Sequence, residues 1–211
     1  MKGMWFGDIH SYTDLNLVMG KPNIPPAAVK TNYVDIPGGD GSLDLTESLG
    51  EVRYKDRACS FPFTVFPNED YEEKKKIISN LLNGRRFRIR LDNDPNYYWE
   101  GRCFVNEYAS DKNIRKVVVG ATVAPYKLKK DITTAIIPAG TGVSRTLVNG
   151  RKSVVPTITN TDDATIVFKG NTYTLKAGTH TILNIELVEG ENLVTVTSAG
   201  QVKFTYQEGD L

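Results

Sequence analysis

Hydrophobic and polar positions alternate along most of this chain in the way that short β-strands require. Residues 87–91 switch strictly between apolar and charged side chains, which predicts a strand with one buried and one solvent-facing side. The aromatic-rich residues 97–105 follow after a polar turn and predict its antiparallel neighbour. Further strands are expected at residues 29–36, 43–45, 53–65 and 115–123. The first half of the chain is therefore predicted to be mainly β.

One segment of the first half has helical spacing instead. Apolar residues recur along one face from residue 71 to residue 82. Asp70 precedes this run as a capping residue, and Glu73 stands at the spacing of a capping box. Gly84 follows the last periodic position, where a helix commonly stops. We expect one helix laid on the sheet, with Lys74, Lys75 and Lys76 on its solvated side.

The composition changes near residue 130, which indicates a second domain. Cys and Trp no longer occur after this point, and Thr, Val, Gly and Asn dominate. Residues 136–142 are interpreted as a linker or domain entry, and Gly170-Asn171 as the turn of a hairpin. Strands are expected at 154–159, 165–169, 172–175, 181–187, 193–197 and 202–206. Such short, evenly spaced strands predict an antiparallel β-sandwich at 135–211, after a first domain at 1–134.

Charge and composition exclude several functions. The 211 residues carry 26 Lys plus Arg and 25 Asp plus Glu, so the net charge of +1 argues against specific nucleic-acid binding. No apolar run approaches the roughly 20 residues that span a bilayer, and the N-terminus lacks a secretory signal. Cys59 and Cys103 are expected to be buried thiols made in a reducing compartment. His10 and His180 are isolated, so we expect no metal site and no cofactor.

Acidic side chains near the predicted 92–96 turn are the candidates for catalysis. A glycosidase would need two of Asp92, Asp94 and Glu100 to face each other across a cleft. Nothing in the sequence places them so, because Asp and Asn are common in turns for backbone reasons. A nucleophile elbow at residues 142–146 lacks its final glycine. We therefore expect no catalytic residues and no enzymatic activity.

Arginines and aromatics near the same turn are candidates for contact. Arg88 and Arg90 share the wet face of an alternating strand, with Arg85 and Arg86 beside them. Local ion pairing and a subunit contact are the two interpretations of this cluster. The aromatic residues 97–99 suit either sugar stacking or packing, since neighbours in a strand point to opposite faces.

Several segments of the chain form an ordered set of motifs. The most distinctive runs from Val34 to Thr46 and contains Ile36-Pro37-Gly38-Gly39-Asp40-Gly41, followed by Leu43-Asp44-Leu45. Weaker motifs lie along nearly the whole chain, at residues 5–11, 15–18, 54, 61–63, 81–84, 91–92, 97–102 and 149–156. In this order the set resembles the distal tail proteins of long-tailed, non-contractile bacteriophages.

The resemblance implies both a fold and a role. It implies an N-terminal split β-barrel with one α-helix and a C-terminal galectin-like antiparallel β-sandwich. Six copies would form a homohexameric ring that joins the tail tube protein to the tail-tip hub or baseplate protein. The protein would be made in the cytoplasm of the host bacterium and act at the virion tail tip, with DNA passing through the ring and no membrane contact.

The candidate subunit-interface residues follow from these two lines of reasoning. They are Ile36, Pro37, Gly38, Gly39, Asp40, Gly41, Arg88 and Arg90. The alternative function is a carbohydrate-binding module or host-receptor adhesin that binds host wall carbohydrate, and a glycosidase is the third. Some members of the family carry inserted sugar-binding modules, whereas this chain is short and shows no insertion.

Overall fold

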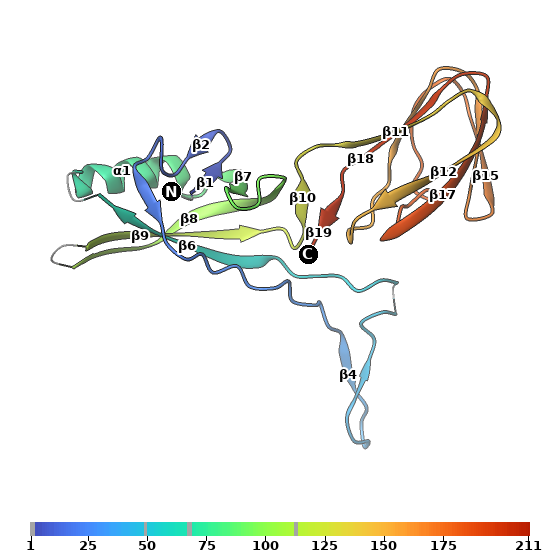
Figure 1. Cartoon of the computed structure of the whole chain (residues 1–211). Helices are drawn as coiled ribbons and strands as arrows, with labels where there is room; N and C mark the ends of the chain where they lie inside the picture. Colours follow the sequence, from blue (N-terminus) through green and yellow to red (C-terminus); the bar gives the residue numbers. More distant parts are fainter. Residues whose placement is uncertain (1–2, 49, 67–68, 112–113) are drawn as a thin grey trace. The chain divides into compact units, whose positions relative to one another are not determined.

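The computed structural model describes residues 3–48, 50–66, 69–111 and 114–211, and β-strands make up most of it (Figure 1). The chain divides into two compact units, Met1–Pro125 and Tyr126–Leu211. This division precedes the boundary expected at 134–135, because a short strand that begins at Lys127 pairs with the end of the second unit.

An antiparallel sheet forms the body of the first unit. Its strands are hydrogen-bonded in the order β2-β1-β7-β8-β9-β6-β3, and the sheet curls into a half-barrel whose end strands do not meet. The strands are β1 (Met4–Phe6), β2 (Ile9–His10), β3 (Leu17–Met19), β6 (Arg57–Val65), β7 (Arg86–Leu91), β8 (Tyr97–Asp111) and β9 (Ile114–Val123). The predicted split barrel is confirmed.

The predicted helix is confirmed as α1 (Tyr71–Leu82). The Asp70 carboxylate caps it by accepting hydrogen bonds from the backbone amides of Glu72 and Glu73. Ile78 and Leu82 are fully buried against the sheet, and no other helix lies within the described residues. α1 is too short and too polar to cross a membrane, so no membrane-spanning helix occurs in this described part of the chain.

One lysine of this helix was predicted wrongly. Lys74 is buried rather than solvated, and its Nζ donates a hydrogen bond to the carbonyl of Leu15 at 3.0 Å. The same ammonium group forms an ion pair with Glu69 at 3.2 Å. Lys74 therefore holds the loop before β3 against the helix.

The two cysteines lie in the core of this unit. Cys59 on β6 and Cys103 on β8 are both paired in register with Ala121 on the strand between them, β9. Both thiols are free and buried, as predicted, and burial raises the pKa of Cys103 to about 12. The two cysteines are separated by two strand spacings of about 4.8 Å each, so their Cα atoms are too far apart for a disulfide.

The first unit also carries a two-stranded ribbon formed by β4 (Tyr33–Asp35) and β5 (Ser42–Asp44). It projects from the sheet of this unit as an extended hairpin (Figure 1). We call residues 28–48 the arm. The predicted strands at 29–36 and 43–45 are thus shorter than expected and lie outside the main sheet.

The second unit is an antiparallel sandwich, as predicted. One sheet has the order β11-β18-β13-β16 and the other β12-β17-β14-β15. Apolar residues from both, including Ile158, Phe204, Ile166 and Val194, form a single buried core. The strands are β11 (Thr133–Ile137), β12 (Gly140–Asn149), β13 (Thr157–Asn160), β14 (Ala164–Phe168), β15 (Asn171–Leu175), β16 (Gly178–Thr181), β17 (Gly190–Ser198) and β18 (Val202–Tyr206). A further pair joins β10 (Lys127–Lys129) to β19 (Gly209–Asp210).

Two expectations for this unit are corrected. Residues 136–142 are not a linker, because they contain the end of β11 and the start of β12. The strand expected at 181–187 is also wrong, since β16 ends at Thr181. The hairpin is confirmed, but its two-residue loop is Lys169-Gly170, both at positive φ, with Phe168 paired to Asn171.

Candidate subunit-contact surface

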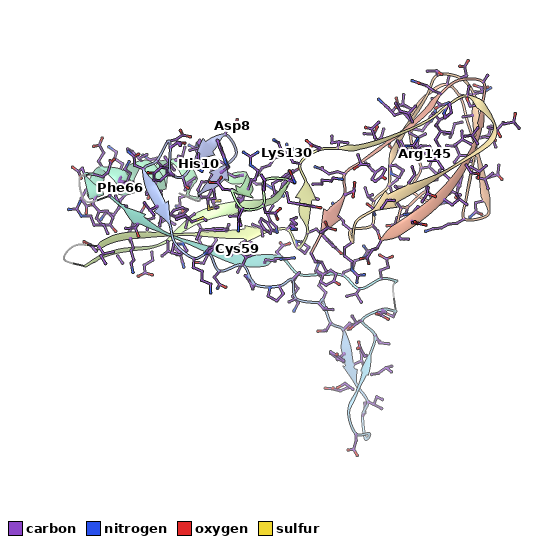
Figure 2. All side chains as sticks on the ribbon, in the orientation of Figure 1. Asp8, His10, Cys59, Phe66, Lys130 and Arg145 are labelled. Atoms are coloured by element: carbon purple, nitrogen blue, oxygen red, sulfur yellow. The ribbon has the colours of Figure 1, made fainter. Side chains whose placement is uncertain are left out.

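The arm is the most exposed part of the described chain. Every residue from Ala28 to Asp44 is exposed to solvent. Among them are large apolar side chains, with Tyr33 58%, Ile36 51% and Leu43 51% exposed. Figure 2 shows side chains standing out from both edges of the hairpin, with no other element of the first unit beside them. Exposed apolar side chains gathered on one element make the arm a candidate contact surface.

Backbone hydrogen bonds give the arm a definite shape. At its base the amide of Lys30 donates to the carbonyl of Arg53, and the amide of Lys55 donates to the carbonyl of Ala28, at 2.8 and 2.7 Å. Further out, Val34 pairs in register with Leu43. The arm is therefore an ordered ribbon, although no core supports it.

The tip of the arm holds most of the predicted contact residues. Gly38 and Gly41 both have φ of +76°, a backbone conformation that side chains with a Cβ rarely adopt. The amide of Gly39 donates to the carbonyl of Ile36 at 3.1 Å and closes the turn. The predicted segment Ile36, Pro37, Gly38, Gly39, Asp40 and Gly41 thus forms one exposed turn.

Opposed residues of the arm point to the same side, so the ribbon has two different faces. Tyr33 is paired with Asp44, and Asp35 with Ser42, which makes one face acidic. Val34 and Leu43 make the other face apolar. The arm carries four acidic residues, Asp35, Asp40, Asp44 and Glu47, and one basic residue, Lys30, at its base. The arm is therefore a negatively charged ribbon with an apolar side.

Arg88 and Arg90 lie elsewhere, on the outer face of the half-barrel. Arg88 forms an ion pair with Glu100 at 3.1 Å, and its guanidinium lies 5.0 Å from the centre of the Tyr98 ring. The guanidinium of Arg90 lies 5.0 Å from the centre of the Trp5 ring. Both side chains have partners within their own chain, and the structure does not bring them to the tip of the arm.

The sequence reasoning missed a hollow beside these arginines. It has a volume of about 330 Å³ and opens on the outer face of β8. Arg86 and Arg102 stand directly opposite each other at its edge in the β7–β8 register. The ring of Phe104, 36% exposed, supplies apolar surface. The lining residues are Asp56, Arg86, Glu100, Gly101, Arg102, Phe104, Thr122 and Ala124. The alternation of inward and outward side chains along each strand indicates which residues share the outer face. The register between β7 and β8, which sets Arg86 opposite Arg102, cannot be inferred from the sequence.

A comparison with solved structures identifies the architecture. The chain is similar to the Dit protein (gp 19.1) of phage SPP1, with a TM-score of 0.71 and 14% sequence identity over 98% of this chain and 99% of that one. That protein is described as a paradigm of the hub adsorption apparatus in phages that infect Gram-positive bacteria. This chain has the Dit fold. The sequence itself matches no family model and no curated protein.

Within this Dit fold, Asp92 has a structural role. Its carboxylate accepts hydrogen bonds from the amide of Gly3 at 2.7 Å and from the indole of Trp5 at 3.1 Å, and it pairs with His10 at 3.1 Å. Burial alone raises the pKa of Asp92, but these hydrogen bonds outweigh it and hold the pKa below its ordinary value. A carboxyl group held as the anion in this way is a poor proton donor.

The remaining acidic candidates lie on the turn and on the strand that follows it. Glu100 is paired with Arg88 on the outer face of β8. Asp92 and Asp94 lie in the turn between β7 and β8, as predicted. In the described ranges, no three His, Cys, Asp or Glu residues are grouped so that they could hold a metal ion.

The histidine and the aromatics near this turn belong to the packing of the Dit fold. The Nδ1 of His10 accepts a hydrogen bond from the amide of Thr13 at 3.2 Å, and the His10 ring lies 4.7 Å from that of Trp5. Trp99 is buried in the core, whereas Tyr98 points to the opposite face. Trp99 is therefore not available to stack on a sugar.

Proposed function

We propose that this protein is a structural component of a phage or prophage tail tip, in which six copies form a ring. The ring joins the tail tube protein to the tail-tip hub or baseplate protein, and DNA passes through its channel. The observation that carries this proposal is the Dit fold along 98% of the chain. The protein acts in the virion after synthesis in the host cytoplasm, and it acts by assembly rather than by catalysis.

The shape of the first unit supports self-assembly. A ring of identical subunits needs one surface that gives a contact and a different surface that receives it, because the interface is heterologous. The arm is a candidate for the first surface, since its apolar side chains lie uncovered on an ordered ribbon. The tip residues 36–41 are proposed as interface residues on this basis. Arg88 and Arg90 are proposed as interface residues from the sequence alone, because they lie on the outer face of the half-barrel and not on the arm.

Native mass spectrometry and negative-stain imaging of the full chain test the proposal. We expect a six-subunit species with six-fold averaged images that show a central channel. Assembly should increase with protein concentration, as it does for contacts between copies. A strict monomer, both alone and with the tail tube and hub proteins added, would contradict the ring.

A second candidate function is the binding of host wall carbohydrate by the sandwich unit. A hollow of about 630 Å³ in this unit is lined by several hydroxyl groups and one carboxylate, which suits hydrogen bonding to a sugar. Its polar lining residues are Thr141, Asp163, Thr165, Thr174, Thr197 and Ser198. Binding of the full chain to an array of bacterial wall sugars tests this second function. If the chain bound none of the wall sugars on the array, this function would be excluded.

A further inference from the structure

We propose that the hollow at Arg86 and Arg102 is the receptor for the arm of a neighbouring copy of this chain. This inference rests on the proposed self-assembly. It also identifies the surface that receives the arm. The acidic face of the arm, with Asp35 and Asp44, faces the two arginines in the assembled contact.

The first argument is the pair of like charges at the edge of the hollow, whose lining also includes the carboxylates of Asp56 and Glu100. Arg86 and Arg102 are directly opposed across an antiparallel strand pair, where like charges are destabilising. Within the part of the chain that the structure describes, Arg86 has no hydrogen-bond or ion-pair partner, and the guanidinium of Arg102 donates to the carbonyl of Gly84. Glu100, the nearest carboxylate on β8, is already paired with Arg88. An incoming carboxylate would relieve this repulsion.

The second argument is the apolar side of the hollow. Phe104 is paired in register with Gly120 on β9, and its ring lies flat over that strand. The ring fits there because Gly120 has no side chain: a Cβ at this position would come within 2.3 Å of the Phe104 ring. The ring is thereby held against the sheet at the edge of the hollow while 36% of its residue surface stays exposed. The site therefore offers guanidinium groups and an aromatic surface side by side.

The third argument is that the arm supplies the matching chemistry. Its acidic face places Tyr33, Asp35 and Asp44 on one side of a ribbon, so an aromatic ring and two carboxylates arrive together. Arginine binds carboxylates through two parallel hydrogen bonds and stacks on aromatic rings. Charge complementarity, with no basic residue from 31 to 52, favours this occupant.

The fourth argument is that the arm does not fill the hollow of its own chain. Ala28 to Asp44 are all exposed, so the arm does not fold back onto its own sheet. Each copy therefore presents one arm and one open hollow. If the arm of each copy binds the hollow of the next copy, the contacts are head-to-tail. Such contacts close into a ring when the rotation between neighbouring subunits is a whole fraction of a full turn.

A charge-swap experiment on the full chain tests this contact. The receptor variant combines Arg86→Glu with Arg102→Glu, and the arm variant combines Asp35→Lys with Asp44→Lys. All four side chains are exposed, so both variants should keep the wild-type circular dichroism spectrum. Sedimentation velocity should show self-association weakened by about 30-fold or more in each variant. An equimolar mixture of the two variants, or a chain with all four changes, should regain association.

The matched control reverses two exposed lysines outside the hollow, Lys76→Glu with Lys130→Glu. It should associate as the wild type does. Two results would overturn the receptor assignment while leaving the ring proposal intact. In the first, the receptor variant self-associates as strongly as the wild type. In the second, the receptor variant self-associates weakly and mixing it with the arm variant does not restore association. A wild-type chain that remains monomeric at all salt and protein concentrations, both alone and with the tail tube and hub proteins added, would overturn the ring and the receptor together.

Discussion

Asp92 joins segments that lie far apart in the sequence. Its carboxylate receives bonds from Gly3, Trp5 and His10, and so fastens the β1–β2 hairpin to the turn between β7 and β8. Hydrogen bonds to a charged acceptor are stronger than those between neutral groups, so this carboxylate should contribute measurably to stability.

We expect Asp92→Asn to lower the free energy of unfolding by about 1–3 kcal/mol at pH 7. The pKa of Asp92 is lowered in the folded protein, so its contribution is present above the ordinary value of 3.8 and is lost as pH falls through the folded pKa. Urea denaturation at pH 7 and at pH 3 should therefore show a smaller loss at pH 3.

The exposed Asp8, in the turn between β1 and β2, provides the control. Asp8→Asn should change stability little, because the side chain is in water. Equal losses in the two variants would show that the bonds to Asp92 do not contribute.

Residue-level predictions from sequence succeeded where the neighbouring residues decide the outcome. Asp70 was identified as a helix cap because capping depends on the next three residues. Lys74 was interpreted wrongly because its partner, the carbonyl of Leu15, is remote in sequence. The pairing of His10 with Asp92 has no local signal either, because 82 residues separate the two. Arg86 was named in the arginine cluster, but its position opposite Arg102 was missed for the same reason, since only the β7–β8 register sets the two opposite each other.

Among the elements, the β14–β15 hairpin shows how a turn sets register. Lys169 and Gly170 both have positive φ, at 48° and 77°, and Phe168 pairs with Asn171 across them. Glycine adopts a backbone with positive φ without strain, and asparagine tolerates it. Lysine is strained in the same conformation.

Substitutions at this turn should therefore change stability in opposite directions. Gly170→Ala should lower the free energy of unfolding by about 1–2 kcal/mol, the cost of a left-handed backbone for a residue with a Cβ. Lys169→Asn should raise it slightly. Thermal denaturation of both variants measures this, and the same sign of change in both would contradict the assignment of the turn.

The predicted elements were most accurate where periodicity was long. The helix, β7 and β9 were found close to their observed bounds because a buried face repeats along each of them. Residues 136–142 were misjudged, because glycine and proline in a bulged strand pattern look like a linker. The arm was predicted as strands, but its separation from the main sheet has no local signal.

For the whole molecule, the fold class and the two-part organisation could be predicted, because the composition changes between the parts and the strands keep their patterns. The strand order could not be inferred, since it depends on pairings between distant segments such as β1 with β7. The match to the Dit fold confirms the architecture that the ordered motifs indicated.

The boundary between the two units gives a prediction at this scale. A chain of residues 126–211 keeps β10, which pairs with β19, and all of β11. A chain of residues 135–211 loses β10 and the first two residues of β11. The longer fragment should unfold in one cooperative transition, and the shorter one should melt about 10 °C lower. Equal melting temperatures in calorimetry would favour the boundary at 134–135.

The uncovered ribbon also affects the protein before assembly. From Ala28 to Asp44 the backbone is open to solvent and no core holds it in place, so a protease can reach it more easily than any strand of the half-barrel. A cut there would remove the contact proposed above. If the arm is buried between copies as proposed, assembly also shields it, so limited proteolysis should cut a free copy faster than an assembled one.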